Sequence, residues 1–161
     1  MSTRADFRRR KKISKRLEEK LAKEVGGVTT AGSGAAEFSG GADVRLQGEL
    51  RIEHKFTESD TYTLKFSDLE KLRKQAIKGG LEEPVFVVEF LKWGKKFAIT
   101  ASSPSSPGAN EKFRTVGVSM RIYVRDIINK TTGLWFRRGE GYKTYLVQPW
   151  EDFLHDRAAH D

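Results

Sequence analysis

The tripeptide Glu53-His54-Lys55, ten residues after Asp43, is the part of the sequence best suited to chemistry. Because side chains alternate along a strand, Glu53 and Lys55 would lie on one face and His54 on the other. Two carboxylates bind a divalent metal ion through hard oxygen ligands, and a lysine can polarise water or stabilise developing negative charge. These side chains together predict hydrolysis of a phosphodiester.

A Glu-x-Lys pattern on a strand is common, because such pairs also form ion pairs on solvent-facing sheets. Two further features of the sequence favour a site. Asp43 begins the preceding strand, where a hairpin register would bring it beside Glu53. The segment Gly32-Ser33-Gly34 offers backbone amides and the Ser33 hydroxyl to a phosphate oxygen.

The first predicted helix, from Phe7 to Val25, would supply a third carboxylate. Gly26-Gly27 ends this helix, because glycine adopts the left-handed conformation favoured at a helix C-terminus. Glu18 lies near the apolar stripe, where it can reach the metal ion or its water shell. Glu19 competes for this role and Glu24 is a weaker candidate. The apolar stripe consists of Ile13, Leu17, Leu21 and Val25.

A hairpin and a crossing helix are predicted to position the acidic residues. The strands Asp43 to Leu46 and Glu49 to Thr57 flank a tight turn, and Tyr62 to Phe66 would extend the same sheet. Ser67 is expected to cap the following helix, with Glu70 completing a capping box. This helix should end at Gly79-Gly80 and bury Leu69, Leu72, Ala76 and Ile77.

The rest of the chain adds more sheet and a closing helix. Val85 to Leu91 is a nearly continuous apolar run, typical of a buried central strand, and residues 102–114 predict an exposed loop. We therefore expect one α/β domain over residues 1–161, with a central mixed sheet flanked by helices. Residues 1–12 form a basic arm and residues 115–161 a C-terminal extension. Further strands are expected at Lys96 to Ala101, Val116 to Ile128, Leu134 to Arg138 and Lys143 to Val147, and a helix at Trp150 to Ala159.

The charge of the chain predicts a polyanionic partner. The net charge is +8 with a pI near 9.7, and no long apolar segment accompanies it, so DNA or RNA is favoured over a membrane. A solvated helix or a solubility tail is the alternative explanation. The basic residues concentrate in one stretch and are our candidates for DNA binding: Arg8, Arg9, Arg10, Lys11, Lys12, Lys15 and Arg16.

Other site chemistries are excluded or disfavoured by composition. The chain has no cysteine, which excludes disulfides, thiolate nucleophiles and cysteine-based zinc sites. Its three histidines are scattered, which argues against a histidine-rich metal site. The basic N-terminus is not followed by an apolar segment, so we expect no secretory signal and a cytoplasmic protein.

In order and spacing, these motifs resemble the archaeal-type Holliday junction resolvases and their phage-encoded relatives, within the PD-(D/E)xK nuclease superfamily. The resemblance covers roughly residues 13 to 101. Ala42 stands where the superfamily's name has proline, and His54 where an apolar residue or cysteine is usual. The motifs that carry it are Glu18-x-x-Leu21-Ala22, Gly32-Ser33-Gly34-Ala35, Asp43, and Ile52-Glu53-His54-Lys55 followed by Thr57.

The resemblance implies a restriction-endonuclease-like fold and a Mg²⁺ site, in which Mn²⁺ should substitute. Asp43, Glu53 and Glu18 would bind the metal ion, and Lys55 and Ser33 would complete the catalytic set. The implied reaction cuts four-way DNA junctions in recombination and repair, leaving a 5′-phosphate and a 3′-hydroxyl. Two symmetric cuts require a C2 homodimer. The alternatives are a related nuclease for flaps, ends or single strands, and a DNA-binding module without catalysis.

Aromatic residues of the C-terminal third allow two interpretations. They could stack on bases, or they could build a sheet face or a dimer interface, and the second is favoured. Arg137 and Arg138, beside Trp135, mark the place to look for an extra DNA contact. The aromatic residues concerned are Phe113, Tyr123, Trp135, Phe136, Tyr142 and Tyr145.

Overall fold

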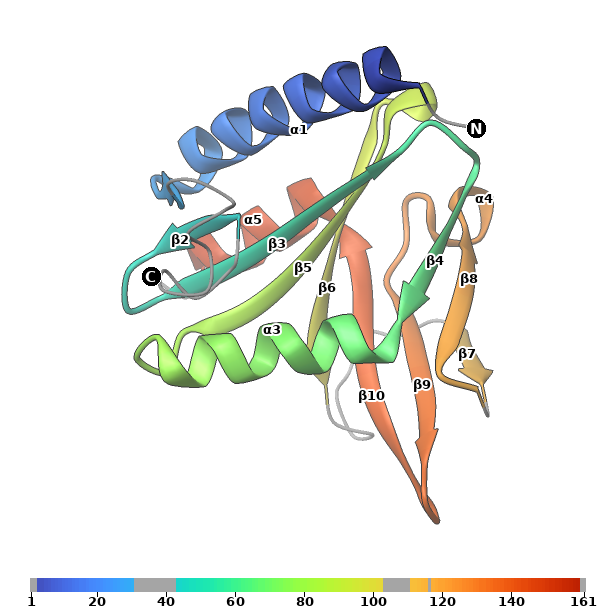
Figure 1. Ribbon diagram of the computed structural model, residues 1–161. Helices are drawn as coiled ribbons and strands as arrows, with labels where there is room; N and C mark the ends of the chain where they lie inside the picture. The colour runs from blue at the N-terminus through green and yellow to red at the C-terminus, as the bar shows by residue number, and fades with distance from the viewer. Residues whose placement is uncertain (1–2, 31–42, 103–110, 116, 160–161) are drawn as a thin grey trace.

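The computed structural model of the protein describes residues 3–30, 43–102, 111–115 and 117–159. Its centre is an eight-stranded mixed sheet, and helices pack on both faces (Figure 1). The elements in chain order are α1 (Arg4–Val25), β1 (Val28–Thr29), β2 (Val44–Leu46), β3 (Leu50–Thr57), β4 (Thr61–Lys65), α3 (Phe66–Lys78), β5 (Glu83–Phe90), η2 (Leu91–Trp93), β6 (Lys95–Ser102), β7 (Glu111–Thr115), β8 (Ser119–Tyr123), α4 (Val124–Ile127), β9 (Thr132–Arg138), β10 (Gly141–Pro149) and α5 (Trp150–Ala159).

The large sheet has the strand order β1-β2-β3-β5-β6-β10-β9-β7. The pairs β3–β5 and β7–β9 are parallel and the other neighbours are antiparallel. The predicted α/β fold with a central mixed sheet flanked by helices is therefore confirmed. Because β10 pairs with β6, the C-terminal extension continues the same sheet.

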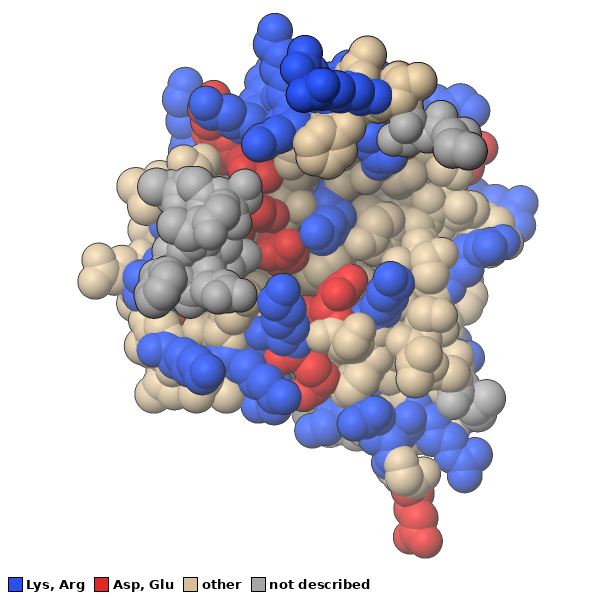
Figure 2. All heavy atoms as spheres, viewed as in Figure 1, with Lys and Arg blue, Asp and Glu red and all other residues tan. Residues whose placement is uncertain are grey.

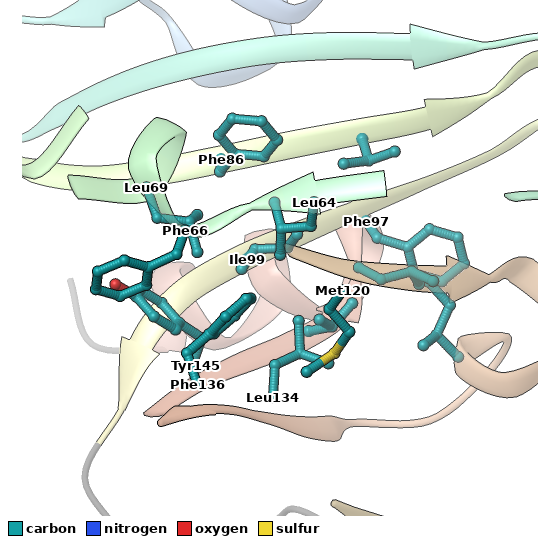
Figure 3. Packing of buried hydrophobic residues seen from close by; sticks show 14 of the residues in the cluster. Leu64, Phe66, Leu69, Phe86, Phe97, Ile99, Met120, Leu134, Phe136 and Tyr145 are labelled. Carbon is teal, nitrogen blue, oxygen red and sulfur yellow. The ribbon is translucent and has the colours of Figure 1, made fainter. Parts of the chain in front are cut away.

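Two hydrophobic clusters fill the two faces of this sheet. Alternate residues of β5 point to opposite sides, so Phe86 and Val88 join one cluster while Val85 and Val87 join the other. The first cluster packs under α3, α4 and the small sheet of β4 and β8 (Figure 3). The second lies under α1 and α5. Both clusters combine residues from early and late parts of the chain.

The helix α1 begins at Arg4, three residues before the predicted start at Phe7. Thr3 caps it through a capping box with Asp6, a local signal that the sequence interpretation missed. The predicted basic arm is therefore helical from Arg4 onward. Gly26 ends the helix with a φ of 73°, as expected. Within the described residues, no helix combines the length and the apolar character needed to cross a membrane.

The hairpin β2–β3 and the crossing helix α3 are confirmed, with two corrections to the helix. Its N-cap is Lys65 rather than Ser67, because Phe66 occupies the first helical position and buries its ring 5.5 Å from that of Phe136. Ile77 is 49% exposed and not buried, since it lies beside the stripe of Leu72 and Ala76.

The pairing of later strands differs most from expectation. The strand predicted at Tyr62 to Phe66, β4, does not extend the central sheet but pairs with β8. Both sides of β3 are already occupied by β2 and β5, so β4 folds over the core and buries Leu64. The strand predicted over Val116 to Ile128 divides into β8 and α4, and β7 begins within the predicted loop of residues 102–114.

A buried charged group joins α3 to the hairpin. The carboxylate of Glu82 accepts hydrogen bonds from Arg51 Nε at 2.9 Å, Arg45 Nε at 2.8 Å and the Gly48 N–H at 2.9 Å. Arg45 Nη2 also donates to the carbonyl oxygen of Gly79 at 2.6 Å, at the end of α3. A Cβ at Gly79 would collide with the ends of the Arg51 and Glu82 side chains, so a larger residue there would have to displace this buried ion pair.

Candidate active site

Asp43 lies directly before β2, at the edge of the hairpin. In the β2–β3 register Val44 pairs with Ile52, and continuing it places Asp43 opposite Glu53. The backbone N–H of His54 donates a 2.8 Å hydrogen bond to Asp43 Oδ2. The Asp43 carboxylate is thus held against β3 by a backbone donor, at the position that the predicted register requires.

Glu53 and Lys55 share one face of β3, as strand alternation predicts. Lys55 Nζ lies 3.2 Å from Glu53 Oε1, and both side chains keep access to solvent. Figure 2 shows a band of acidic side chains across the middle of this face, between α1 and α3, with Lys and Arg on either side. A bound phosphate would therefore meet acidic groups in the centre and basic groups around them.

The carboxyl groups of this site have raised pKa values. Burial raises the pKa of Asp43, and the charge of Glu53 raises it further, to about 6. Burial likewise raises the pKa of Glu53 above its ordinary value. Two carboxylates that each oppose the other's ionisation are stabilised by a cation placed between them.

Lys55 supplies a fixed positive charge beside these carboxylates. Partial burial alone would lower its pKa, but the carboxylates of Glu53 and Asp43 outweigh burial and raise it. Lys55 is therefore an ammonium group in the metal-free site. That form donates hydrogen bonds and stabilises negative charge, and it does not accept a proton.

Glu18 is the helical carboxylate that faces the site. Its pKa is raised first by burial and then by the charge of Asp43, and Ser14 Oγ donates to Glu18 Oε1 at 2.8 Å. Glu19 is exposed. Glu24 instead accepts hydrogen bonds from Trp150 Nε1 at 2.6 Å and Lys96 Nζ at 2.9 Å. The packing of α1 thus distinguishes three candidates that the sequence alone left open.

His54 points to the opposite face, where it is buried beneath α1. Its Nε2 lies 3.1 Å from Glu89 Oε1, and its Nδ1 has no hydrogen-bond partner among the described residues. This location agrees with the interpretation of His54 as a packed residue. Ser33, together with Gly32 and Gly34, lies outside the described residues.

The predicted DNA-binding residues are exposed along the first half of α1: Arg8, Arg9, Arg10, Lys11, Lys12, Lys15 and Arg16. Two of them contact the strand that carries the site. Arg9 Nη2 lies 3.0 Å from Glu58 Oε1, just after β3. The Arg10 guanidinium lies 5.4 Å from the ring centre of Phe56. Through these contacts the basic face of α1 is held next to β3.

Three residues of α3 join the site without having been predicted. Asp68, Lys71 and Gln75 line a pocket of about 80 Å³ together with Glu53 and Lys55. Lys71 lowers the pKa of Glu53 and Asp68 raises it, after the larger effects of burial and Lys55. Their spacing of three and four residues places them on one helix face, a pattern visible in the sequence but not interpreted there.

The carboxylate oxygens of Asp43, Glu53 and Glu18 are the kind of ligand that a hard divalent cation prefers. Among the described residues no three acidic or histidine side chains form a closed ligand group. Mg²⁺ does not need one, because it is usually bound by one or two carboxylates and completes its shell with water and substrate phosphate. Asp43 and Glu53 fit that role, and Glu18 lies within electrostatic reach of Asp43.

No protein-family model matches the chain, and no curated protein matches it.

Proposed function

We propose that this protein is a metal-dependent endodeoxyribonuclease that resolves four-way DNA junctions. The observation that carries the proposal is the placement of Asp43 opposite Glu53, with the Lys55 ammonium 3.2 Å from Glu53. Clustered carboxylates repel phosphate, so a protein that only binds DNA gains nothing from them. If Asp43 and Glu53 held a metal ion, the same groups would attract the scissile phosphate.

The element order supports a PD-(D/E)xK type of fold. The chain runs α1, β1, β2, β3, β4, α3, β5, and α3 lies in the crossover between the parallel strands β3 and β5. One acidic residue lies at the start of β2, and the Glu-x-Lys pair lies on β3. This is the arrangement expected from the resemblance of the motifs to that superfamily. The strands β9 and β10 and the helix α5 are additions to it.

The residues of the site can be assigned separate tasks. Asp43 and Glu53 would hold Mg²⁺, with Glu18 binding its water shell. When bound, the metal ion neutralises phosphate charge and makes water more acidic. Lys55, as an ammonium, donates hydrogen bonds to the phosphate and stabilises the charge that develops on it. Lys71, on the opposite wall of the pocket, adds a second positive charge near the same phosphate.

The basic half of α1 supports a nucleic-acid substrate. Its exposed Lys and Arg side chains would contact phosphates, which gives affinity and orientation without reading sequence. Preference for a junction would then come from the shape of the branched DNA. A C2 homodimer would place two identical sites on two symmetry-related strands.

The direct test compares Mg²⁺-dependent cleavage of a synthetic four-way junction, a linear duplex and a flap at matched ionic strength. We expect the junction to be cut fastest, with symmetric incisions on opposing strands. Equal rates on the three substrates would overturn junction selectivity and leave a general nuclease. Lack of cleavage of all three with Mg²⁺ or Mn²⁺ would overturn the enzymatic proposal.

A further inference from the structure

A second surface of interest lies at the other end of the large sheet, on the outer face of β7, β9 and β10. Leu134 and Phe136 of β9 point into the first hydrophobic cluster. Because side chains alternate along a strand, Trp135 and Arg137 point to the opposite face of the sheet. By the same alternation, β7 and β10 contribute further side chains to that face. The surface is defined here as Lys112, Arg114, Trp135, Arg137 and Tyr142, and we call it the Trp135 surface.

The side chains of the Trp135 surface contact one another through an aromatic pair and through cations placed against the rings. Trp135 and Tyr142 have ring centres 5.5 Å apart. Lys112 Nζ and Arg114 Cζ each lie 4.9 Å from the centre of the Trp135 ring, and Arg114 Cζ lies 6.0 Å from that of Tyr142. Tyr142 is 39% exposed. Cations held against accessible aromatic rings are therefore presented together to solvent.

Among the described residues, the positive charges of this surface have no acidic partner within ion-pair distance. Among the described residues Lys112, Arg114 and Arg137 form no ion pair, and Arg137 Nε donates a hydrogen bond to the Gly139 carbonyl oxygen. Some exposed arginines elsewhere do have acidic partners, as Arg73 has Glu70 and Arg9 has Glu58. The Trp135 surface thus combines net positive charge with aromatic planes.

We propose that the Trp135 surface binds single-stranded DNA. The three cations would contact the phosphates, and Trp135 and Tyr142 would stack on bases. Duplex DNA offers the same phosphates but hides the faces of its bases, so the aromatic pair favours an unpaired strand. The sheet order separates β9 from β3 by four strand spacings, about 19 Å, so this surface is distinct from the carboxylate site. The proposal does not depend on hydrolysis.

The first test measures binding of a fluorescein-labelled oligo(dT) by fluorescence anisotropy, in EDTA to prevent cleavage. Tyr142→Ala should weaken binding by about fivefold or more, as expected for loss of one base stack. Arg114→Gln with Arg137→Gln should reduce the slope of log affinity against log salt by about 0.7 per lost phosphate contact. The matched controls are Trp93→Ala, which removes an exposed aromatic residue elsewhere, and Lys74→Gln with Lys78→Gln, which removes two charges from α3.

A second measurement reports on Trp135 directly and does not depend on a destabilising change. Stacking on a base quenches indole fluorescence, so oligo(dT) should quench the emission of the wild-type protein. Trp135→Phe should lose this quenching, whereas Trp93→Phe should keep it. Equal quenching in both variants, or equal affinity losses in the surface and control variants, would overturn the proposal. So would unchanged affinity after Tyr142→Ala.

Discussion

Asp43 accepts a hydrogen bond from the backbone N–H of His54, and this bond holds its carboxylate opposite the neighbouring residue Glu53. A backbone donor cannot rotate away as a side chain can, so the position of Asp43 is fixed by the strand itself. This placement has an electrostatic cost, because burial and the charge of Glu53 both oppose the ionisation of Asp43. A site that is unfavourable when empty is suited to binding a cation.

We expect Asp43→Asn to abolish cleavage while junction binding persists. The amide oxygen can still accept from the His54 N–H, but it no longer offers a charged ligand, and the loss of rate should be at least about 100-fold. Cleavage assays with Mg²⁺ and gel-shift affinities with Ca²⁺ measure the two properties separately. Undiminished cutting by this variant would show that Asp43 is not a metal ligand.

The same substitution should stabilise the metal-free protein in a pH-dependent manner. Asp43 has a folded pKa of about 6, above its ordinary value of 3.8, so folding favours its protonated form. Its favourable contribution is complete at low pH and is lost as the pH rises through 6. In EDTA, the Tm advantage of Asp43→Asn over wild type should therefore grow between the two pKa values, 3.8 and about 6, and level off above them at a few degrees. Glu19→Gln, at an exposed position, is the control and should show no such growth.

Adding a divalent cation should reverse the difference in Tm between Asp43→Asn and wild type. If Asp43 is a metal ligand as proposed, Mg²⁺ should raise the wild-type Tm with concentration, because it would bind the folded site, and should leave the Tm of Asp43→Asn almost unchanged. Differential scanning fluorimetry measures both without any substrate. Equal shifts in the two proteins would argue against metal binding at Asp43.

Lys71→Gln should slow junction cleavage about tenfold, because it removes the positive charge that faces Glu53 and Lys55 across the pocket. Lys74→Gln removes an equal charge from an exposed position one helical turn later and should have little effect. Single-turnover rates under saturating enzyme compare the two variants without contributions from affinity. Equal rates would place Lys71 outside the site.

Glu82→Gln should destabilise the fold by about 3–5 kcal/mol, because it removes the negative charge that the buried Arg51 guanidinium contacts at 2.9 Å. Glu83→Gln, at the next and exposed position, is the matched control and should change the free energy of unfolding by less than about 0.5 kcal/mol. Denaturant unfolding monitored by tryptophan fluorescence provides both values.

Local patterns were enough to predict much of the fold. The hairpin β2–β3, the buried strand β5 and the glycine that ends α1 follow from alternation, apolar runs and backbone conformation. The partner of β4 could not be predicted, because pairing with β8 joins segments more than fifty residues apart. That choice depends on which strand edges are already occupied.

For the candidate site, too, local patterns predicted some features and the tertiary structure was needed for others. Glu53 and Lys55 were placed on one face by alternation alone, and the turn at Gly48 set Asp43 opposite Glu53. The choice of Glu18 over Glu19 required the rotation of α1, which is fixed by burial of Leu17 and Leu21 against the sheet. The contribution of α3 depends on how that helix crosses β3, and no local pattern contains this information.

The buried carboxylate of Glu82 affects how the elements around the site unfold. Glu82 binds Arg45 and Arg51 of the hairpin that carries Glu53, and Arg45 also binds the end of α3 at Gly79. The helix α3 carries Lys71, and Asp43 lies just before the hairpin. These elements cannot separate without exposing a desolvated ion pair, so they should unfold together as one cooperative unit. Amide hydrogens of β3 and of α3 should then exchange with solvent at a shared rate.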